Sequence, residues 1–211
     1  ERGRNARIAV VGGGIAGASL VRALRRRGVM PGFYDCDGVG TGASGNPFAL
    51  VMPRMDAGDS PAARFHAEAY RYAVRQYAGS EAWDPVGVLV MLEQDASFVR
   101  AGKAREHDWH PAARAELLDA AAASEVAGVE LECRGLFHAD AGLLRTDTLL
   151  REWTEGTACV ARRVAGLGRS GGALRLLDEH GDVLGEADTV ILAAGIANAS
   201  FSATDWLPIA P

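Results

Sequence analysis

The sequence predicts an α/β fold with a buried parallel sheet. Residues 7–11 (Arg-Ile-Ala-Val-Val) form a short apolar run, followed by glycines and then by apolar residues at helical spacing. This is the order of a β-α-β unit. Near the other end, residues 189–195 (Thr-Val-Ile-Leu-Ala-Ala-Gly) form a second apolar run that ends in a glycine. Continuous apolar runs are typical of strands buried on both faces.

Length and composition are those of a globular protein. The chain has 211 residues, of which 48% are hydrophobic and 23% charged, so it can bury a core without disulfides or metals. The net charge of −5 gives no basic footprint for non-specific nucleic-acid binding. The three cysteines are far apart and form no Cys-x-x-Cys, so no disulfide framework or thiolate zinc site is expected. Because no apolar run reaches ~20 residues and no signal-peptide pattern is seen, we expect a cytoplasmic protein without membrane contact.

Local signals delimit the N-terminal β-α-β unit. Residues 18–27 have helical spacing, with Leu20, Val21 and Leu24 on one side. The helix ends in three arginines, which favour the negative end of the helix dipole, and Gly28 stops it. A second strand is expected at 32–35 and ends in an acid.

The middle of the chain predicts helices and short strands. Ser60 followed by Pro61 is the start signal of a helix, which Gly79 ends and which carries Phe65 and Tyr72 on one face. Residues 95–123 are rich in alanine and charged residues, which predicts two surface helices broken at Pro111. Further elements are expected as strands at 86–92, 136–138, 143–145, 159–164, 173–177 and 183–186, and as a helix from Thr146 to Trp153.

The strongest functional signal is Gly12-x-Gly14-x-x-Gly17, with Asp35 standing 18 residues after the last glycine. In a Rossmann-like dinucleotide-binding fold, the first glycine allows a tight turn and the second lets a pyrophosphate approach the backbone. The third lets the helix pack against the strand. Amides at the helix N-terminus bind the phosphates, and an acid at this distance accepts hydrogen bonds from the adenosine ribose. The alternative is a glycine-rich turn in an unrelated α/β fold.

Two further segments, together with the extra glycine at Gly13, favour FAD over NAD. The loop 42–46 (Gly-Ala-Ser-Gly-Asn) offers backbone amides and a hydroxyl to the flavin side of the pyrophosphate; the alternative is a flexible surface loop. The strand that ends at Ala194 and Gly195 brings small residues close to a cofactor; the alternative is an ordinary buried strand. The three segments together point to one FAD site.

At this point the sequence resembles a known family. The segment from Gly12 to Asp35 is similar to the FAD fingerprint of the D-amino-acid oxidase superfamily, which includes glycine and sarcosine oxidases. Within it, the chain resembles the oxidoreductase domain of bifunctional enzymes that make 5-methylaminomethyl-2-thiouridine in tRNA. The residues that carry this second resemblance are 42–46 with Pro53, 133–137 (Cys-Arg-Gly-Leu-Phe) and Gly142. Ala49 departs from the pattern, which usually has a glycine there.

The resemblance implies a Rossmann-like FAD-binding domain with a partial inserted antiparallel α+β substrate domain. It places the first part of the FAD-binding domain at 1–80, the substrate domain at 81–150 and the second FAD-binding part at 151–211. The implied cofactor-binding residues are Gly12, Gly14, Ile15, Ala16 and Gly17 at the pyrophosphate, Asp35 at the ribose, Ala43, Ser44 and Asn46 in the flavin-side loop, Val164 at the adenine, and Ala194 and Gly195 in the late glycine motif. No catalytic acid or base carries over.

The implied activity is FAD-dependent oxidation of a secondary amine. The carboxymethyl group of 5-carboxymethylaminomethyl-uridine in tRNA would leave as glyoxylate, in a protein that also carries a methyltransferase domain. Two alternatives stay open: an oxidase of a free amino acid such as glycine or sarcosine, and a dinucleotide-binding module without chemistry of its own. The superfamily continues beyond Pro208, so we expect the 211-residue chain alone to hold FAD weakly and to be inactive.

The other candidate residues give weaker signals of function. Arg54, just after the flavin-side loop, is predicted to bind an anionic group of the substrate. His107 and His110 have the spacing of metal ligands, but the polar region around them predicts an exposed helix face, so no metal is expected. The arginines of the first helix could touch tRNA phosphates, although a solvated helix end is the simpler interpretation; they are Arg22, Arg25, Arg26 and Arg27.

Overall fold

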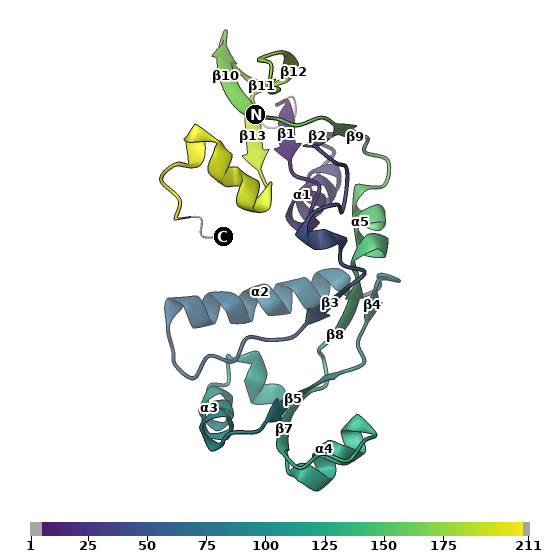
Figure 1. The fold of residues 1–211 in the computed structure, drawn as a ribbon, viewed down its shortest axis with the longest axis vertical. Coiled ribbons are helices and arrows are strands. Elements are labelled where there is room, and N and C mark those ends of the chain that lie inside the picture. Colours follow the sequence, from purple (N-terminus) through teal and green to yellow (C-terminus); the bar gives the residue numbers. More distant parts are fainter. Residues whose placement is uncertain (1–5, 209–211) are drawn as a thin grey trace. The chain divides into compact units, whose positions relative to one another are not determined.

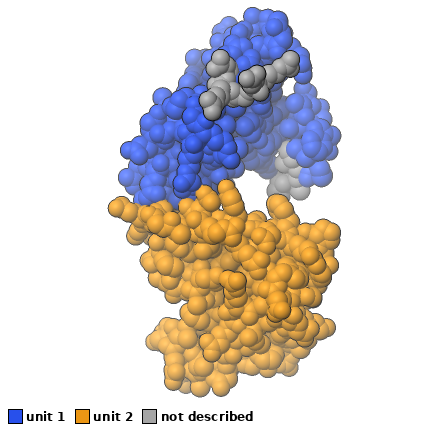
Figure 2. All heavy atoms as spheres, turned by 180° about the vertical axis from the view of Figure 1, so that it is seen from behind, with its two compact units in different colours: residues 1–47, 146–211 blue, residues 48–145 orange. Residues whose placement is uncertain are grey.

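The computed structural model describes residues 6–208 as two compact units (Figures 1 and 2). Unit 1 combines the segments 1–47 and 146–211, and unit 2 is the segment 48–145. The sequence led us to place these boundaries at residues 80 and 150. The chain enters unit 2 earlier because strand β3 (Phe48–Val51) pairs with β8 (Gly142–Arg145), the last strand of that unit.

Unit 1 contains a four-stranded sheet of order β13-β1-β2-β9, in which every pair is parallel. A three-stranded antiparallel sheet of order β10-β11-β12 accompanies it. This arrangement confirms the predicted α/β class (Figure 1). The elements are β1 (Ile8–Val11), α1 (Ile15–Arg25), β2 (Gly32–Asp35), η1 (Ala43–Gly45), α5 (Thr146–Thr154), β9 (Cys159–Ala161), β10 (Gly166–Ser170), β11 (Ala173–Leu177), β12 (Val183–Ala187), β13 (Thr189–Leu192), η3 (Gly195–Ser200) and η4 (Ser202–Thr204).

Strand β1 is buried on both faces, and its residues alternate between two cores. Val10 packs with Val21 of α1 and Phe33 of β2, whereas Val11 belongs to a second cluster that contains Leu176 of β11. Successive side chains of a strand point to opposite faces. One face of the parallel sheet is therefore covered by α1 and the other by the β10–β12 sheet, which is why the strand sequence is apolar throughout.

The turn between β11 and β12, at residues 179–182, is held by a buried carboxylate. Asp178 is only 4% exposed. Its Oδ1 accepts hydrogen bonds from the amides of His180 and Asp182, both at 2.9 Å. Its Oδ2 accepts from the Arg162 guanidinium at 2.7 Å. These bonds hold the pKa of Asp178 below its usual value, although burial alone would raise it.

Unit 2 is built from two three-stranded antiparallel sheets, of order β3-β8-β4 and β5-β7-β6. The strands expected at 136–138 and 143–145 are both present, but they lie in different sheets. Besides β3 and β8, the elements are α2 (Pro61–Tyr77), β4 (Trp83–Asp84), β5 (Val88–Leu92), α3 (Asp95–Arg105), η2 (Pro111–Arg114), β6 (Glu116–Leu118), α4 (Ala120–Ala127) and β7 (Arg134–His138).

Helix α2 starts as the sequence predicts. The hydroxyl of Ser60 accepts a hydrogen bond from the amide of Ala63 at 3.1 Å, and Pro61 follows the cap. The side with Phe65 and Tyr72 faces outward, since these residues are 70% and 56% exposed.

The prediction of two surface helices across 95–123 is wrong for the second helix. Helix α3 ends at Arg105, and Pro111 opens the short turn η2 instead of a second long helix. The segment Glu116–Leu118 pairs with β7 as strand β6. Strand pairing therefore overrides the helix propensity of this alanine-rich stretch. Several alanines of the stretch face inward: those at 101, 104, 112, 115 and 123 are at most 3% exposed, whereas Val99 of α3 is 54% exposed.

Two glycines within helices make a matched test of packing. A Cβ at Gly17 of α1 would lie 1.8 Å from the Gly12 carbonyl oxygen, whereas a Cβ at Gly102 of α3 meets nothing within 4 Å. We expect Gly17→Ala to lower the free energy of unfolding by at least ~2 kcal/mol through overpacking against backbone. Gly102→Ala should raise it by ~1 kcal/mol through helix propensity. Urea denaturation followed by circular dichroism measures both; equal effects would contradict the close approach.

Candidate functional site

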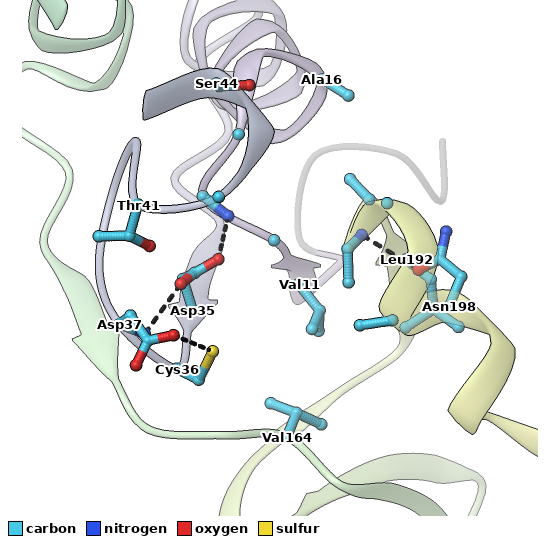
Figure 3. Close-up of a pocket in the computed structure, with 18 of the residues that line it drawn as sticks. Val11, Ala16, Asp35, Cys36, Asp37, Thr41, Ser44, Val164, Leu192 and Asn198 are labelled. Carbon is cyan, nitrogen blue, oxygen red and sulfur yellow. Dashed lines mark hydrogen bonds between the residues drawn. The ribbon is translucent and has the colours of Figure 1, made fainter. Parts of the chain in front are cut away.

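A pocket of about 760 Å³ lies in unit 1 at the carboxyl ends of the parallel strands (Figure 3). Val11, Asp35 and Leu192, the last residues of β1, β2 and β13, all line it. Its volume is within the range of small-molecule sites. Ligands of open α/β sheets bind at this edge. The rest of the lining comes from 12–16, 20, 36–37, 41–44, 163–165, 193–195, 197–198 and 200–201.

The glycine loop after β1 is shaped by close backbone contacts. Gly12 has φ +118°, and a Cβ there would lie 2.3 Å from the carbonyl oxygen of Ala193. Gly12 lines the pocket, as do Gly14, Ile15 and Ala16. Gly17 does not line it, because its role is the close packing of α1 against Gly12. With Gly13, which also lines the pocket, the motif thus contributes five pocket residues and one packing contact.

Asp35 fastens the glycine loop from the end of β2. Its Oδ2 accepts a hydrogen bond from the Gly13 amide at 2.6 Å, and its Oδ1 accepts from the Asp37 amide at 3.0 Å. Both contacts are drawn in Figure 3. Each carboxylate oxygen has two lone pairs, so Asp35 can orient the loop and still accept from hydroxyl groups in the pocket.

The loop after β2 caps helix α1. Gly14 occupies the N-cap position and has no side chain to offer. The hydroxyl of Ser44 takes over this function, accepting a hydrogen bond from the Ile15 amide at 3.0 Å. Ala43 and Ser44 line the pocket. Asn46 does not: it is exposed, and its carbonyl oxygen accepts from the Thr146 hydroxyl, which fixes the start of α5.

The far wall comes from the C-terminal part of unit 1. Ala194 and Gly195 follow β13 and line the pocket together with the buried Val164. The Ala194 amide donates to Asn198 Oδ1 at 3.0 Å, which holds the turn into η3. Our sequence interpretation missed Asn198; its position four residues after Ala194, in a turn, was the available signal.

The rim beside Asp35 carries a thiol and a cation that our sequence interpretation also missed. The Cys36 thiol donates to Asp37 Oδ2 at 3.0 Å. This bond, with burial and the nearby carboxylates, raises the pKa of Cys36, and Arg163 opposes the rise. The thiol therefore stays protonated at neutral pH and is no nucleophile. Arg163 is the one cation that the described lining contains.

Of the other candidates, the four arginines at 22, 25, 26 and 27 lie in or directly after α1 in unit 1 and do not line the pocket, whereas Arg54, His107 and His110 lie in unit 2. Arg54 is exposed and pairs with Asp56, with its Nε 3.2 Å from Oδ1; its role toward a substrate stays a prediction. His110 is 1% exposed, so the expected exposed helix face at His107 and His110 is wrong for this residue. Across residues 6–208 no three side chains of His, Cys, Asp or Glu are grouped to hold a metal ion. In the same range, no helix has the length and apolar character needed to span a bilayer.

The pocket fits a dinucleotide. No hydrogen-bond acceptor for the amides of Gly14 and Ala16 is found in the described part of the chain. The first turn of α1 carries no acidic residue, so the positive end of the helix dipole is open to phosphate. The loop, the Asp35 carboxylate and this helix end converge on one cavity, which defines a dinucleotide-binding α/β protein.

Over residues 7–211 the sequence matches the family DAO, FAD dependent oxidoreductase, and the chain belongs to that family. The family membership agrees with the resemblance stated from the motifs and identifies FAD as the family's cofactor.

Two related proteins have the same name. The tRNA 5-methylaminomethyl-2-thiouridine biosynthesis bifunctional protein MnmC of Magnetococcus marinus is 35% identical over 198 residues, which are 89% of this chain and 29% of that protein. The protein of the same name in Caulobacter vibrioides is 34% identical over 197 residues, 93% of this chain and 32% of that protein. The chain therefore spans about a third of these relatives.

Solved structures share the fold. Fructosyl amine:oxygen oxidoreductase (Amadoriase I) of Aspergillus fumigatus superposes with a TM-score of 0.72 at 17% identity, covering 95% of this chain and 51% of that one. Iminodiacetate oxidase of Chelativorans sp. gives a TM-score of 0.69 at 22% identity, covering 92% and 56%. At these identities the likeness concerns the fold alone.

The Ser44 cap can be tested without any ligand. Ser44→Ala removes the acceptor of the Ile15 amide, so we expect the free energy of unfolding to fall by ~1 kcal/mol. Thr41→Ala is the matched control, since it removes a hydroxyl of the same loop whose bond to the Gly38 carbonyl is exposed. Its cost should be within ~0.5 kcal/mol. Thermal unfolding measures both, and equal losses would show that Ser44 is not the cap.

Proposed function

We propose that the pocket of unit 1 binds FAD and that the protein carrying this chain oxidises a secondary amine. The favoured substrate is 5-carboxymethylaminomethyl-uridine in tRNA, from which the carboxymethyl group leaves as glyoxylate. The observation that carries FAD binding is the convergence of the glycine loop, Asp35 and the α1 N-terminus on one cavity, in a member of an FAD-dependent family. The substrate is inferred from the relatives named for biosynthesis of a modified tRNA nucleoside.

The proposal gives each wall of the pocket a part of the cofactor. The amides of Gly14 and Ala16 would bind the pyrophosphate, and Asp35 would accept from the adenosine ribose. Val164 would pack beside the adenine. The flavin side would be met by Ala43 and Ser44 of one loop and by Ala194 and Gly195 of the other. Bound FAD supplies the hydride acceptor, while the protein supplies position and electrostatics.

The charges of the pocket suit this placement. The α1 N-terminus offers positive potential to a diphosphate, whereas Asp35 and Asp37 lie together at the end of β2. The anionic part of a dinucleotide would thus meet the helix end, and its hydroxyl groups would meet Asp35, which bonds the neighbouring Gly13 amide. Ser44 accepts from the Ile15 amide, so its own proton is left to donate toward a phosphate oxygen.

A free amino acid such as glycine or sarcosine is the second candidate substrate. The net charge of −5 favours it, because a tRNA-binding protein gains affinity from basic surface. Arg54 is proposed to hold an anionic group in either case. A fused methyltransferase domain and a cytoplasmic location also stay predictions, as does the weak FAD binding expected of residues 1–211 alone.

The function is tested by product release. The intact protein that carries these residues is purified, its flavin absorbance recorded, and glyoxylate measured after incubation with tRNA containing 5-carboxymethylaminomethyl-uridine, with glycine, or with sarcosine. We expect a flavin spectrum and release from the tRNA. Release from the free amino acids only would replace the substrate, and a flavin-free protein without release would overturn the proposal.

Asp35 tests the cofactor site. We expect Asp35→Ala to weaken FAD binding by at least ~10-fold, because hydrogen bonds to a charged group contribute ~1.5–3 kcal/mol each. Fluorescence titration of the apo form measures the affinity, and circular dichroism checks that the fold is kept. Asp205→Ala, an exposed acid outside the pocket lining, is the matched control and should leave the affinity unchanged. Unchanged affinity in Asp35→Ala would remove this residue from the site.

A further inference from the structure

The side chain of His110 in unit 2 caps a turn. Its Nδ1 accepts a hydrogen bond from the Ala112 amide at 3.0 Å, at the N-cap of η2. The imidazole is only 1% exposed. N-caps are ordinarily Ser, Thr, Asp or Asn, whose oxygen remains an acceptor at any physiological pH. An imidazole differs, because the nitrogen that accepts this bond is also the one that binds the second proton.

The hydrogen bond fixes the tautomer of the neutral ring. Since Nδ1 accepts, the hydrogen of neutral His110 must lie on Nε2. A second proton would go to Nδ1, and the cation would then have two donors and no acceptor. The Ala112 N–H would face an N–H, and the cap would be lost.

The segment that His110 caps is tied down at several points. The His110 amide donates to the His107 carbonyl at 2.8 Å, and the Ala113 amide donates to the His110 carbonyl at 2.9 Å. The Arg71 guanidinium of α2 donates to the carbonyl oxygen of Trp109. The guanidinium of Arg64 lies 5.4 Å from the centre of the Trp109 ring. His110 thus lies within a stretch that joins α3 to β6 and is anchored to α2.

Several charged and titratable groups near His110 act on its pKa. Burial is the largest influence and lowers the pKa of His110; His107 and Arg71 lower it further, whereas Asp56 and the backbone of Arg54 raise it. A second imidazole, His138 at the end of β7, is also 1% exposed. Burial lowers its pKa as well, with the charge of His110 adding and that of Asp140 opposing. Both rings are therefore neutral at pH 7.

We propose that His110 is a proton-sensitive latch of unit 2: the neutral ring caps η2 and holds the segment from His107 to Ala115, and the protonated ring releases it. The direction follows from linkage. A pKa lowered by folding means that the unfolded chain binds the proton more readily. The stabilisation is complete above the unfolded value of about 6.5 and is lost as the pH falls below it. None of the residues from His107 to Ala115 lines the pocket in unit 1.

Hydrogen exchange of the Ala112 amide tests the latch in the full chain. The protection factor, which is corrected for the intrinsic exchange rate, is measured by NMR near neutral pH and in mild acid. In the parent chain we expect it to fall about fivefold or more on acidification, the size of a lost N-cap. In His110→Asn, whose side-chain oxygen accepts at either pH, it should stay constant. In His110→Ala it should be low at both.

Two outcomes overturn the proposal. One is constant Ala112 protection in the parent chain across the titration of His110. The other is a His110→Asn variant with the same pH dependence as the parent. Should the variants fail to fold, the parent chain still decides: the imidazole resonances of His110 and the amide resonance of Ala112 must titrate with one midpoint. An Ala112 midpoint that instead follows His138 assigns the effect to that residue and overturns the latch.

Discussion

The structure of unit 1 depends on tight packing of the backbone at Gly12, where the end of β1 passes between the segment after β13 and helix α1. A side chain at Gly12 would collide with the Ala193 carbonyl beyond β13, and a side chain at Gly17 of α1 would collide with the Gly12 carbonyl. The end of β1 can therefore pass between its neighbouring strand and its own helix only with glycine at both positions. That passage brings the α1 N-terminus to the strand ends, where the pocket lies.

The loop after β2 holds the glycine loop and helix α1 in place. The Gly13 peptide is held on both sides, its amide by Asp35 and its carbonyl by the Gly40 amide at 3.0 Å. Ser44 of the same loop caps α1. Two loops separated in sequence thus fasten each other. The amides of Gly14 and Ala16, for which residues 6–208 supply no acceptor, are those proposed to bind phosphate. Binding groups that are fixed in advance lose little entropy when a ligand arrives.

The sequence predicts the parts of the fold that local chemistry decides. The β-α-β unit, its glycine loop and the Ser60 cap all follow from neighbours within a few residues. The structure differs from the sequence prediction where pairing partners are distant. Strand β6 exists because β7 lies beside it, and the boundary of unit 2 is set at Phe48 by β8, almost a hundred residues later. Asn46, which the sequence predicts as a cofactor-binding residue, is exposed, and its carbonyl oxygen accepts from the Thr146 hydroxyl, a contact that no local pattern predicts.

Backbone groups dominate the proposed cofactor site. Gly12 and Gly17 are restricted by collisions with backbone atoms, whereas Ile15, Ala16, Ala43 and Ala194 contribute position rather than side-chain chemistry. A site of this kind requires a small residue or a particular backbone conformation at only a few positions. Side-chain chemistry matters instead at positions such as Asp35 and the buried His110. There a single side-chain atom accepts a hydrogen bond from a backbone amide, so replacing that atom removes the bond.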